Sequence, residues 1–140
     1  MRLFFALSLA FTLACGGLSR EQGVTLPNQM DTIGLGYIEQ KQLLQEGEQL
    51  RCFYDATVSL DGTELYLVTD RRVITHKDGR TTAINLTDVA SIDRVEVPMT
   101  DAWLVSSTNG EAVQVEVAAL NGGDTFEKIL RAAWSAAKGG

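Results

Sequence analysis

Apolar and polar positions alternate with a period of two over most of this chain, a pattern typical of half-buried β-strands. In residues 50–60 one face carries Cys52, Tyr54, Ala56, Val58 and Leu60. The same alternation predicts strands at residues 63–69, 71–77, 80–86, 92–99, 102–107 and 111–117. We therefore expect seven short strands.

Asx-Gly pairs stand between neighbouring strands at Asp61-Gly62, Asp78-Gly79 and Asn109-Gly110. Such pairs favour two-residue hairpin turns, which require positive φ angles. The strands on either side of each pair are therefore expected to be antiparallel.

Two segments change to helical spacing. Residues 33–46 predict a short helix that ends at Gly47. Near the C-terminus, Asp124 to Glu127 has the form of a capping box, which predicts that a helix begins there. One apolar stripe follows, formed by Phe126, Ile129, Leu130, Ala133, Trp134 and Ala137.

These elements predict one domain, residues 33–140, with its core at 45–138. Its expected class is mainly β with a C-terminal α-helix, in a seven-stranded antiparallel half-open barrel that the helix caps. Such a length suffices for one domain with a real core and not for two.

Residues 1–14 form an apolar run behind a single basic residue, Arg2, and predict a signal peptide. About a dozen apolar residues span roughly 18 Å as a helix, well short of the ~30 Å hydrocarbon core of a bilayer. The chain is therefore expected to be extracytoplasmic.

The segment from Thr12 to Gly17 resembles a bacterial lipobox, with Ala14 followed by Cys15. The resemblance implies that Cys15 becomes the first mature residue and carries lipid, which anchors the protein to a membrane of the cell envelope. Thr12 and Leu13 stand in the reverse of the usual order, so ordinary cleavage after Ala14 is the alternative. Incorporation of labelled palmitate at Cys15 distinguishes the two.

Residues 15–32 contain several glycines and Pro27 without periodicity, and predict a flexible lipid-anchored tether. Cys52 is the other of the two cysteines. If Cys15 carries lipid, Cys52 is an unpaired thiol in an oxidising compartment and should be buried. Without lipid, a disulfide between the two remains an alternative.

Charge excludes one class of partner. The chain has 12 basic and 18 acidic residues, and loss of Arg2 with the signal peptide takes the net charge from −6 to −7. Nucleic-acid binding depends on neutralising phosphates with basic side chains, so no nucleic-acid partner is expected.

Three segments, residues 46–50, 66–74 and 83–92, carry a family resemblance. They are a Gly-Glu pair before the first strand, the run from Tyr66 to Ile74, and the run from Ala83 to Ile92. Together they resemble the bacterial pleckstrin-homology-like (PH-like) and GRAM families. The resemblance covers residues 45–138 and implies a seven-stranded barrel with a C-terminal helix, in proteins that are mostly scaffolds or binding modules.

Candidate chemistry is sparse. No catalytic set, metal-ligand spacing or cofactor motif is evident, and His76, the single histidine, is expected to be an exposed strand residue. Trp103 and Trp134 are expected in the core. The hairpin at residues 58–64 is acidic, which argues against the headgroup binding known in the family. One basic stretch consists of Arg71, Arg72, Lys77 and Arg80. It is interpreted either as a solvated strand face or as a contact for an anionic lipid or a peptide.

The expected function is therefore a non-enzymatic envelope lipoprotein. Its barrel would bind a protein partner or a second copy of itself, through an edge strand or the groove beside the helix. The alternative is a carrier that holds a lipid or small molecule inside the barrel.

Overall fold

The computed structural model of the chain describes residues 23–29, 32–57 and 63–139. The predicted signal peptide, Cys15 and the predicted turn at Asp61-Gly62 lie outside these residues.

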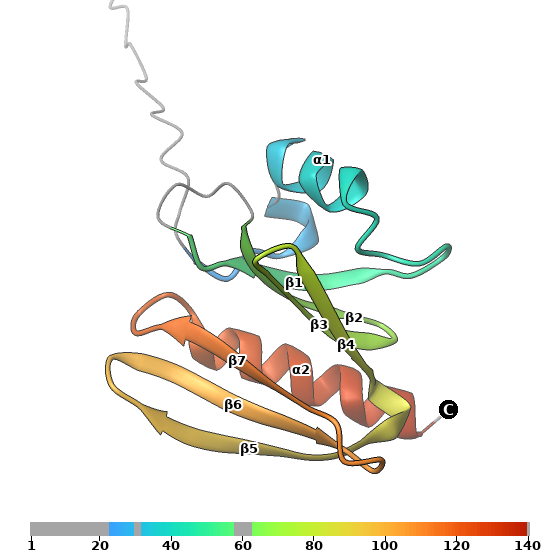
Figure 1. Cartoon of the computed structure of the whole chain (residues 1–140), viewed down its shortest axis with the longest axis vertical. Helices are drawn as coiled ribbons and strands as arrows, with labels where there is room; N and C mark the ends of the chain where they lie inside the picture. The colour runs from blue at the N-terminus through green and yellow to red at the C-terminus, as the bar shows by residue number, and fades with distance from the viewer. Residues whose placement is uncertain (1–22, 30–31, 58–62, 140) are drawn as a thin grey trace, which may run out of the picture.

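Seven described strands form two antiparallel sheets (Figure 1). The four-stranded sheet has the order β1 (Leu50–Asp55), β2 (Glu64–Thr69), β3 (Arg72–Lys77), β4 (Arg80–Asn85). The three-stranded sheet has the order β5 (Val89–Val97), β6 (Thr100–Ser107), β7 (Ala112–Ala118). The described strands do not close into a barrel. The predicted mainly-β, half-open arrangement with a C-terminal helix is confirmed.

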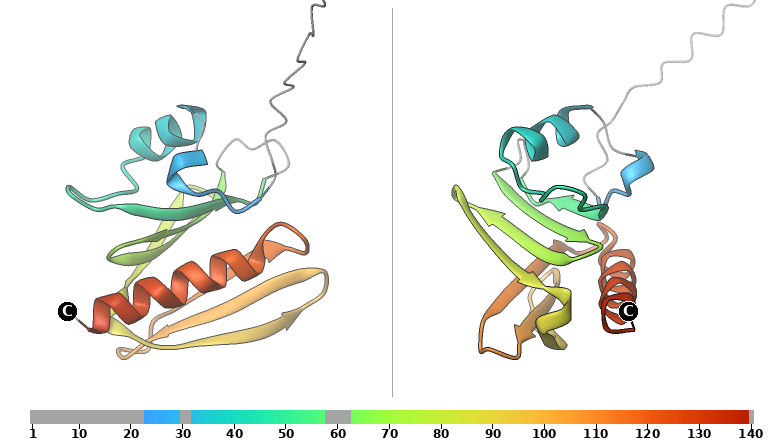
Figure 2. Two further views of the ribbon diagram at one scale, coloured as in Figure 1. Left: turned by 180° about the vertical axis from the view of Figure 1, so that it is seen from behind. Right: turned by 90° about the vertical axis from the view of Figure 1, so that its right-hand side faces the viewer.

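The main core lies between the two sheets and helix α2 (Gly123–Lys138), which lies along the open side between the sheets as Figure 2 shows. All members of the predicted apolar stripe of α2 belong to this cluster. Trp103 of β6 is fully buried and stacks on Phe126 with ring centroids 6.0 Å apart. The apolar stripe predicted for the C-terminal helix is therefore confirmed.

A second cluster covers the opposite face of the four-stranded sheet. Helix α1 (Thr32–Gln40) and the α1–β1 loop, residues 41–49, supply Ile38 and Leu43, which pack on Leu65, Leu67 and Ile74. Both faces of β2 are consequently buried. Alternation had predicted a sheet with one solvent-exposed face. Helix α1 and the α1–β1 loop, together called the outer layer, cover that face too.

Helix α1 ends six residues earlier than its predicted end at Glu46. Gln42 has a φ of 52°, the Leu43 amide donates to the Ile38 carbonyl at 3.1 Å, and the Gln42 amide donates to the Glu39 carbonyl at 3.0 Å. This is a Schellman ending, in which Ile38 and Leu43 also make the usual apolar contact. The prediction that Gly47 ends the helix is wrong, because the apolar contact fixes an earlier end.

The predicted capping box is also wrong. Helix α2 begins at Gly123 after Gly122, whose φ is 92°, and no side chain caps it. Asp124 lies inside the first turn, where Arg94 approaches its carboxylate at 3.5 Å. Gly123 is packed so tightly that a Cβ there would collide with the Asp101 side chain. Close packing, rather than a side-chain cap, determines where α2 starts.

Residues 23–29 end in the 3₁₀ turn η1 (Pro27–Gln29) and contact the domain. The Val24 amide donates to the Asn121 carbonyl at 2.9 Å, and Thr25 forms a two-bond bridge with Phe53 of β1. A second 3₁₀ turn, η2 (Leu86–Asp88), joins β4 to β5. The last part of the predicted tether thus lies against the edge of the first sheet.

Candidate functional site

The four residues of the predicted basic stretch do not gather in one place. Arg71 and Arg72 lie at the β2–β3 turn, whereas Lys77 and Arg80 lie at the β3–β4 turn, at the other end of β3. A six-residue strand separates its ends by roughly 16 Å. The two pairs therefore cannot grip one small headgroup together.

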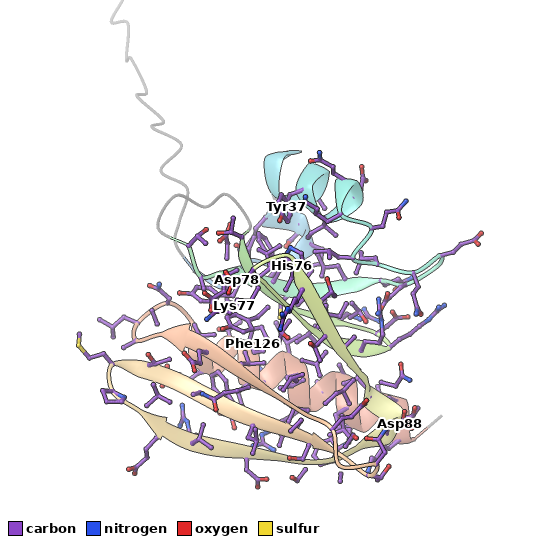
Figure 3. The ribbon with its side chains drawn as sticks, viewed as in Figure 1. Tyr37, His76, Lys77, Asp78, Asp88 and Phe126 are labelled. Carbon is purple, nitrogen blue, oxygen red and sulfur yellow. The ribbon has the colours of Figure 1, made fainter. Side chains whose placement is uncertain are left out.

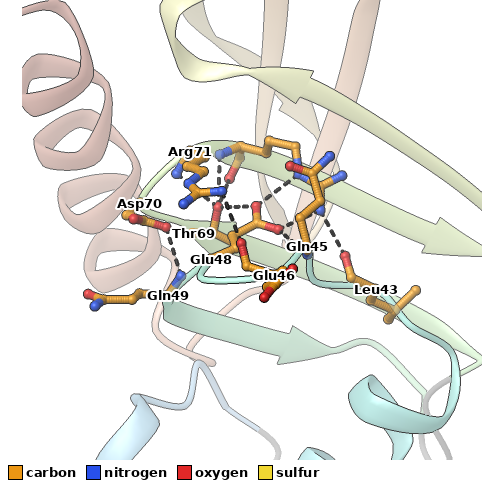
Figure 4. Close-up of polar contacts among 9 residues, drawn as sticks. Leu43, Gln45, Glu46, Glu48, Gln49, Thr69, Asp70 and Arg71 are labelled. Carbon is orange, nitrogen blue, oxygen red and sulfur yellow. Dashed lines mark hydrogen bonds and ion pairs between the residues drawn. The ribbon is translucent and has the colours of Figure 1, made fainter.

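Arg72 is engaged inside the protein. Its guanidinium donates to both carboxylate oxygens of Glu48, at 2.8 and 2.6 Å, and to the Leu43 carbonyl at 2.9 Å (Figure 4). The Glu48 carboxylate also accepts the Thr69 hydroxyl at 2.6 Å and the Gln45 amide at 2.7 Å. This network joins the α1–β1 loop to the β2–β3 turn.

The electrostatics of Glu48 follow from that geometry. Burial acts to raise the pKa of the carboxyl, but the hydrogen bonds from Arg72, the Gln45 amide and Thr69 outweigh it. Together with the Arg72 charge they hold the pKa at about 2, below the ordinary value of 4.5. Glu48 is therefore an ionised partner of Arg72 and stabilises the fold.

The other three basic side chains are exposed. Arg71 donates to the Glu46 carbonyl at 3.3 Å, and Lys77 pairs with Glu64 at 3.3 Å across the β2–β3 ladder. Exposed pairs of this kind contribute little to stability. Their arrangement suits a solvated strand face.

His76 is buried, contrary to the expectation that it would be exposed. Its Nε2 lies 3.1 Å from the Tyr37 hydroxyl of α1, and its Nδ1 lies 2.9 Å from the Thr81 hydroxyl (Figure 3). Burial and the nearby Lys41 charge lower its pKa. This burial could not be predicted from the sequence of the strand, because it depends on α1 covering the outer face of the sheet.

Cys52 is buried and free among the described residues, and its burial agrees with the prediction from the sequence. Burial raises its pKa to about 12, despite a hydrogen bond with the Val68 backbone. A thiol attacks as its thiolate, so this group is unreactive while the domain is folded. Its role is packing.

Strand β5 is an edge strand of the three-stranded sheet. Helix α2 partly covers that edge: Arg131 donates to the Ile92 carbonyl at 3.0 Å, and Trp134 donates to the Val89 carbonyl at 3.2 Å. Trp134 packs against the main core as predicted, but neither of these bonds was predicted from the sequence. They satisfy carbonyls on the first half of the strand.

The second half of β5 presents free backbone groups. Val97 and Thr100 flank the two-residue β5–β6 turn, so Val97 bonds to β6 and the alternate residues Arg94 and Glu96 face outward. No described residue forms a backbone hydrogen bond with these two on the outer side. An open hollow of about 620 Å³ adjoins this segment, lined from Arg94 to Pro98 and from Thr100 to Ala102. Outward backbone groups of this kind are the ones with which an added strand pairs.

Searches against protein-family models and against curated proteins find no match to this chain. Within the part of the chain that the structure describes, no helix is long and apolar enough to cross a membrane. The same residues contain no group of three or more His, Cys, Asp or Glu side chains placed to hold a metal ion.

Proposed function

We propose that this chain is an exported lipoprotein, anchored through Cys15, whose PH-like domain is a non-enzymatic interaction module. The module adds a strand of a partner protein, or of a second copy of itself, to the outer edge of β5. Sheets of four and three strands with a C-terminal helix support the PH-like assignment.

The observation that carries the proposal is the division of the β5 edge. Its first half is covered by Trp134 and Arg131, while Arg94 and Glu96 keep outward backbone groups beside an open hollow. Exposed edges are templates for pairing, and strand addition is a common mode of peptide recognition. An added strand must end where Trp134 and Arg131 cover the first half of β5.

The carrier alternative has less support. The space between the sheets and α2 is filled by fully buried side chains, among them Trp103, Phe126 and Leu130. The hollow beside β5 lies at the surface and is formed by a hairpin. A ligand held inside would have to displace core side chains.

A proline at position 96 tests strand addition. The Glu96 N–H faces away from β6, so Glu96→Pro leaves the β5–β6 ladder intact but removes a donor that an added strand needs. Glu96→Thr removes the same charge and keeps the N–H, which makes it the matched control. In-cell crosslinking of the lipoprotein, followed by mass spectrometry, should give a product in the wild type and Glu96→Thr that Glu96→Pro lacks. Equal products from both variants would refute the edge.

The anchor is tested separately. Labelled palmitate should enter the wild-type protein and not Cys15→Ser. Label that persists in Cys15→Ser, or that never enters the wild type, would remove the lipoprotein assignment without bearing on the β5 edge.

A further inference from the structure

Two large apolar side chains are almost fully exposed at one end of the domain. Met99, in the β5–β6 turn, is 87% exposed, and Leu120, in the β7–α2 turn, is 101% exposed. With the exposed Pro98 beside Met99 they form a group that we name the apolar tip. The two turns are joined, because the Ala119 amide donates to the Met99 carbonyl at 2.9 Å.

Both side chains occupy backbone positions that disfavour them. Met99 has a φ of 56° and Leu120 a φ of 71°, each at the third position of a tight turn where glycine or asparagine is usual. The two other described residues of this kind outside glycine, Gln42 and Asp78, are polar. Neither apolar side chain contacts the core, so internal packing does not offset the strain.

The predicted tether joins the domain at the same end. Val24 bonds to the carbonyl of Asn121, the residue after Leu120, and its side chain lies beside Gly122. Figures 1 and 2 show the β5–β6 and β7–α2 turns at one end of the sheets. Cys15 precedes Gly23 by eight residues, so the two are at most about 28 Å apart whatever the intervening conformation. A lipid on Cys15 therefore keeps this end of the domain close to a bilayer.

We propose that the apolar tip inserts into the bilayer to which Cys15 is anchored and so fixes the orientation of the domain on the membrane. A bilayer is the expected partner of the tip because the tether to Cys15 keeps the tip near one, so this inference rests on the lipoprotein assignment above. With the tip in the bilayer, the β5 edge stands beside the membrane, where a neighbouring protein can reach it.

The charges beside the tip define the type of contact. Arg94 lies 3.3 Å from Asp101 and 3.5 Å from Asp124, so its charge is already paired with acidic groups. Among the residues that the structure describes, no free basic cluster lies beside the tip to attract anionic headgroups. Insertion is therefore hydrophobic, with affinity insensitive to salt, and each side chain that enters hydrocarbon strengthens binding about tenfold or more.

Fluorescent probes test insertion directly. Met99→Cys and Leu120→Cys are labelled with an environment-sensitive dye in the lipoprotein purified from its envelope, where the buried Cys52 thiol does not react. Thr108→Cys is the control, because it is exposed in the β6–β7 turn at the opposite end of β6. In phosphatidylethanolamine–phosphatidylglycerol vesicles, brominated lipid should quench the probes at 99 and 120 and not at 108, in low and high salt alike. Equal quenching at all three positions, or none, would overturn the proposal.

A second variant separates insertion from folding. Asparagine suits a positive φ, so Met99→Asn with Leu120→Asn should leave the melting temperature unchanged or higher. In the presence of vesicles, hydrogen exchange of the backbone amides in the β5–β6 and β7–α2 turns should slow severalfold in the wild type and not in the double variant. If palmitate never enters the protein, the unlipidated wild type and the unlipidated double variant are added to the same vesicles. The wild type should still bind at least tenfold more tightly, because only it carries the apolar tip. Equal binding of the two would refute insertion.

Discussion

Replacing Glu48 with glutamine should remove a pH-dependent part of the stability of this domain. In the native fold Arg72 and Thr69 hold the pKa of this carboxyl at about 2, against an ordinary value of 4.5. The difference corresponds to about 3 kcal/mol at neutral pH, at about 1.4 kcal/mol per unit. The native pKa is the lower one, so this stabilisation is complete above pH 4.5 and is lost as the pH falls towards 2.

The assay is urea unfolding of the wild type and Glu48→Gln at pH 7 and pH 3. At pH 7 the variant should be less stable by about 3 kcal/mol, since the nearly buried Arg72 guanidinium loses its charged partner. At pH 3 the unfolded wild type has already taken up a proton, so the difference should shrink to about 1 kcal/mol. The comparison cancels the acid dependence of the other carboxylates.

Glu46→Gln is the matched control. Glu46 is exposed on the same loop, and Arg71 bonds to its backbone carbonyl rather than to its carboxylate. This variant should unfold as the wild type does at both pH values. A stability difference for Glu48→Gln that stays constant between pH 7 and pH 3 would refute the reasoning, because the ionised Glu48 would then not be what the network stabilises.

Three further predictions concern the outer layer and the thiol. Gln42→Gly should stabilise the domain by about 0.5–1 kcal/mol in thermal unfolding, because its φ of 52° favours glycine. Gln40→Gly, at the last position of α1, should destabilise it. The same sign for both would contradict the Schellman ending. His76, the single histidine, should show by NMR a pKa below 6.5. Because the pKa is lower in the native state than in the unfolded state, the stability contributed by the neutral imidazole should be lost as the pH falls below 6.5. A normal pKa would show that α1 does not cover this residue. Cys52 should resist iodoacetamide at pH 8 in the folded protein and react once urea unfolds it; rapid alkylation of the native domain would contradict its burial.

The strand pattern could be predicted from the sequence because each strand repeats a local rule. Val113, Val115 and Val117 alternate with polar residues and face the core as expected. The turns at Asp78-Gly79 and Asn109-Gly110 also fall where Asx-Gly pairs stand. Such features depend on neighbours in the chain.

The features that could not be predicted depend on residues far apart. Arg72 looked like a free cation, and its partner Glu48 lies 24 positions away. His76 looked exposed because nothing in its own strand shows that α1 covers that face. The apolar tip left only a weak trace, since a methionine after Pro98 and a leucine before Asn121 resemble ordinary strand ends. Their exposure depends on the left-handed turns that carry them.

The outer layer of α1 and the α1–β1 loop has a consequence for how the domain opens. It rests on a small apolar cluster, the Glu48–Arg72 network and the contact between Tyr37 and His76, and the main core cluster contains none of its residues. Amide protons of α1 should therefore exchange with solvent through a local opening, well before those of β6 and β7, which require global unfolding. Such an opening would uncover Leu67 and Ile74 on a paired sheet, and it would expose α1 and the α1–β1 loop to proteolytic cleavage before the rest of the domain.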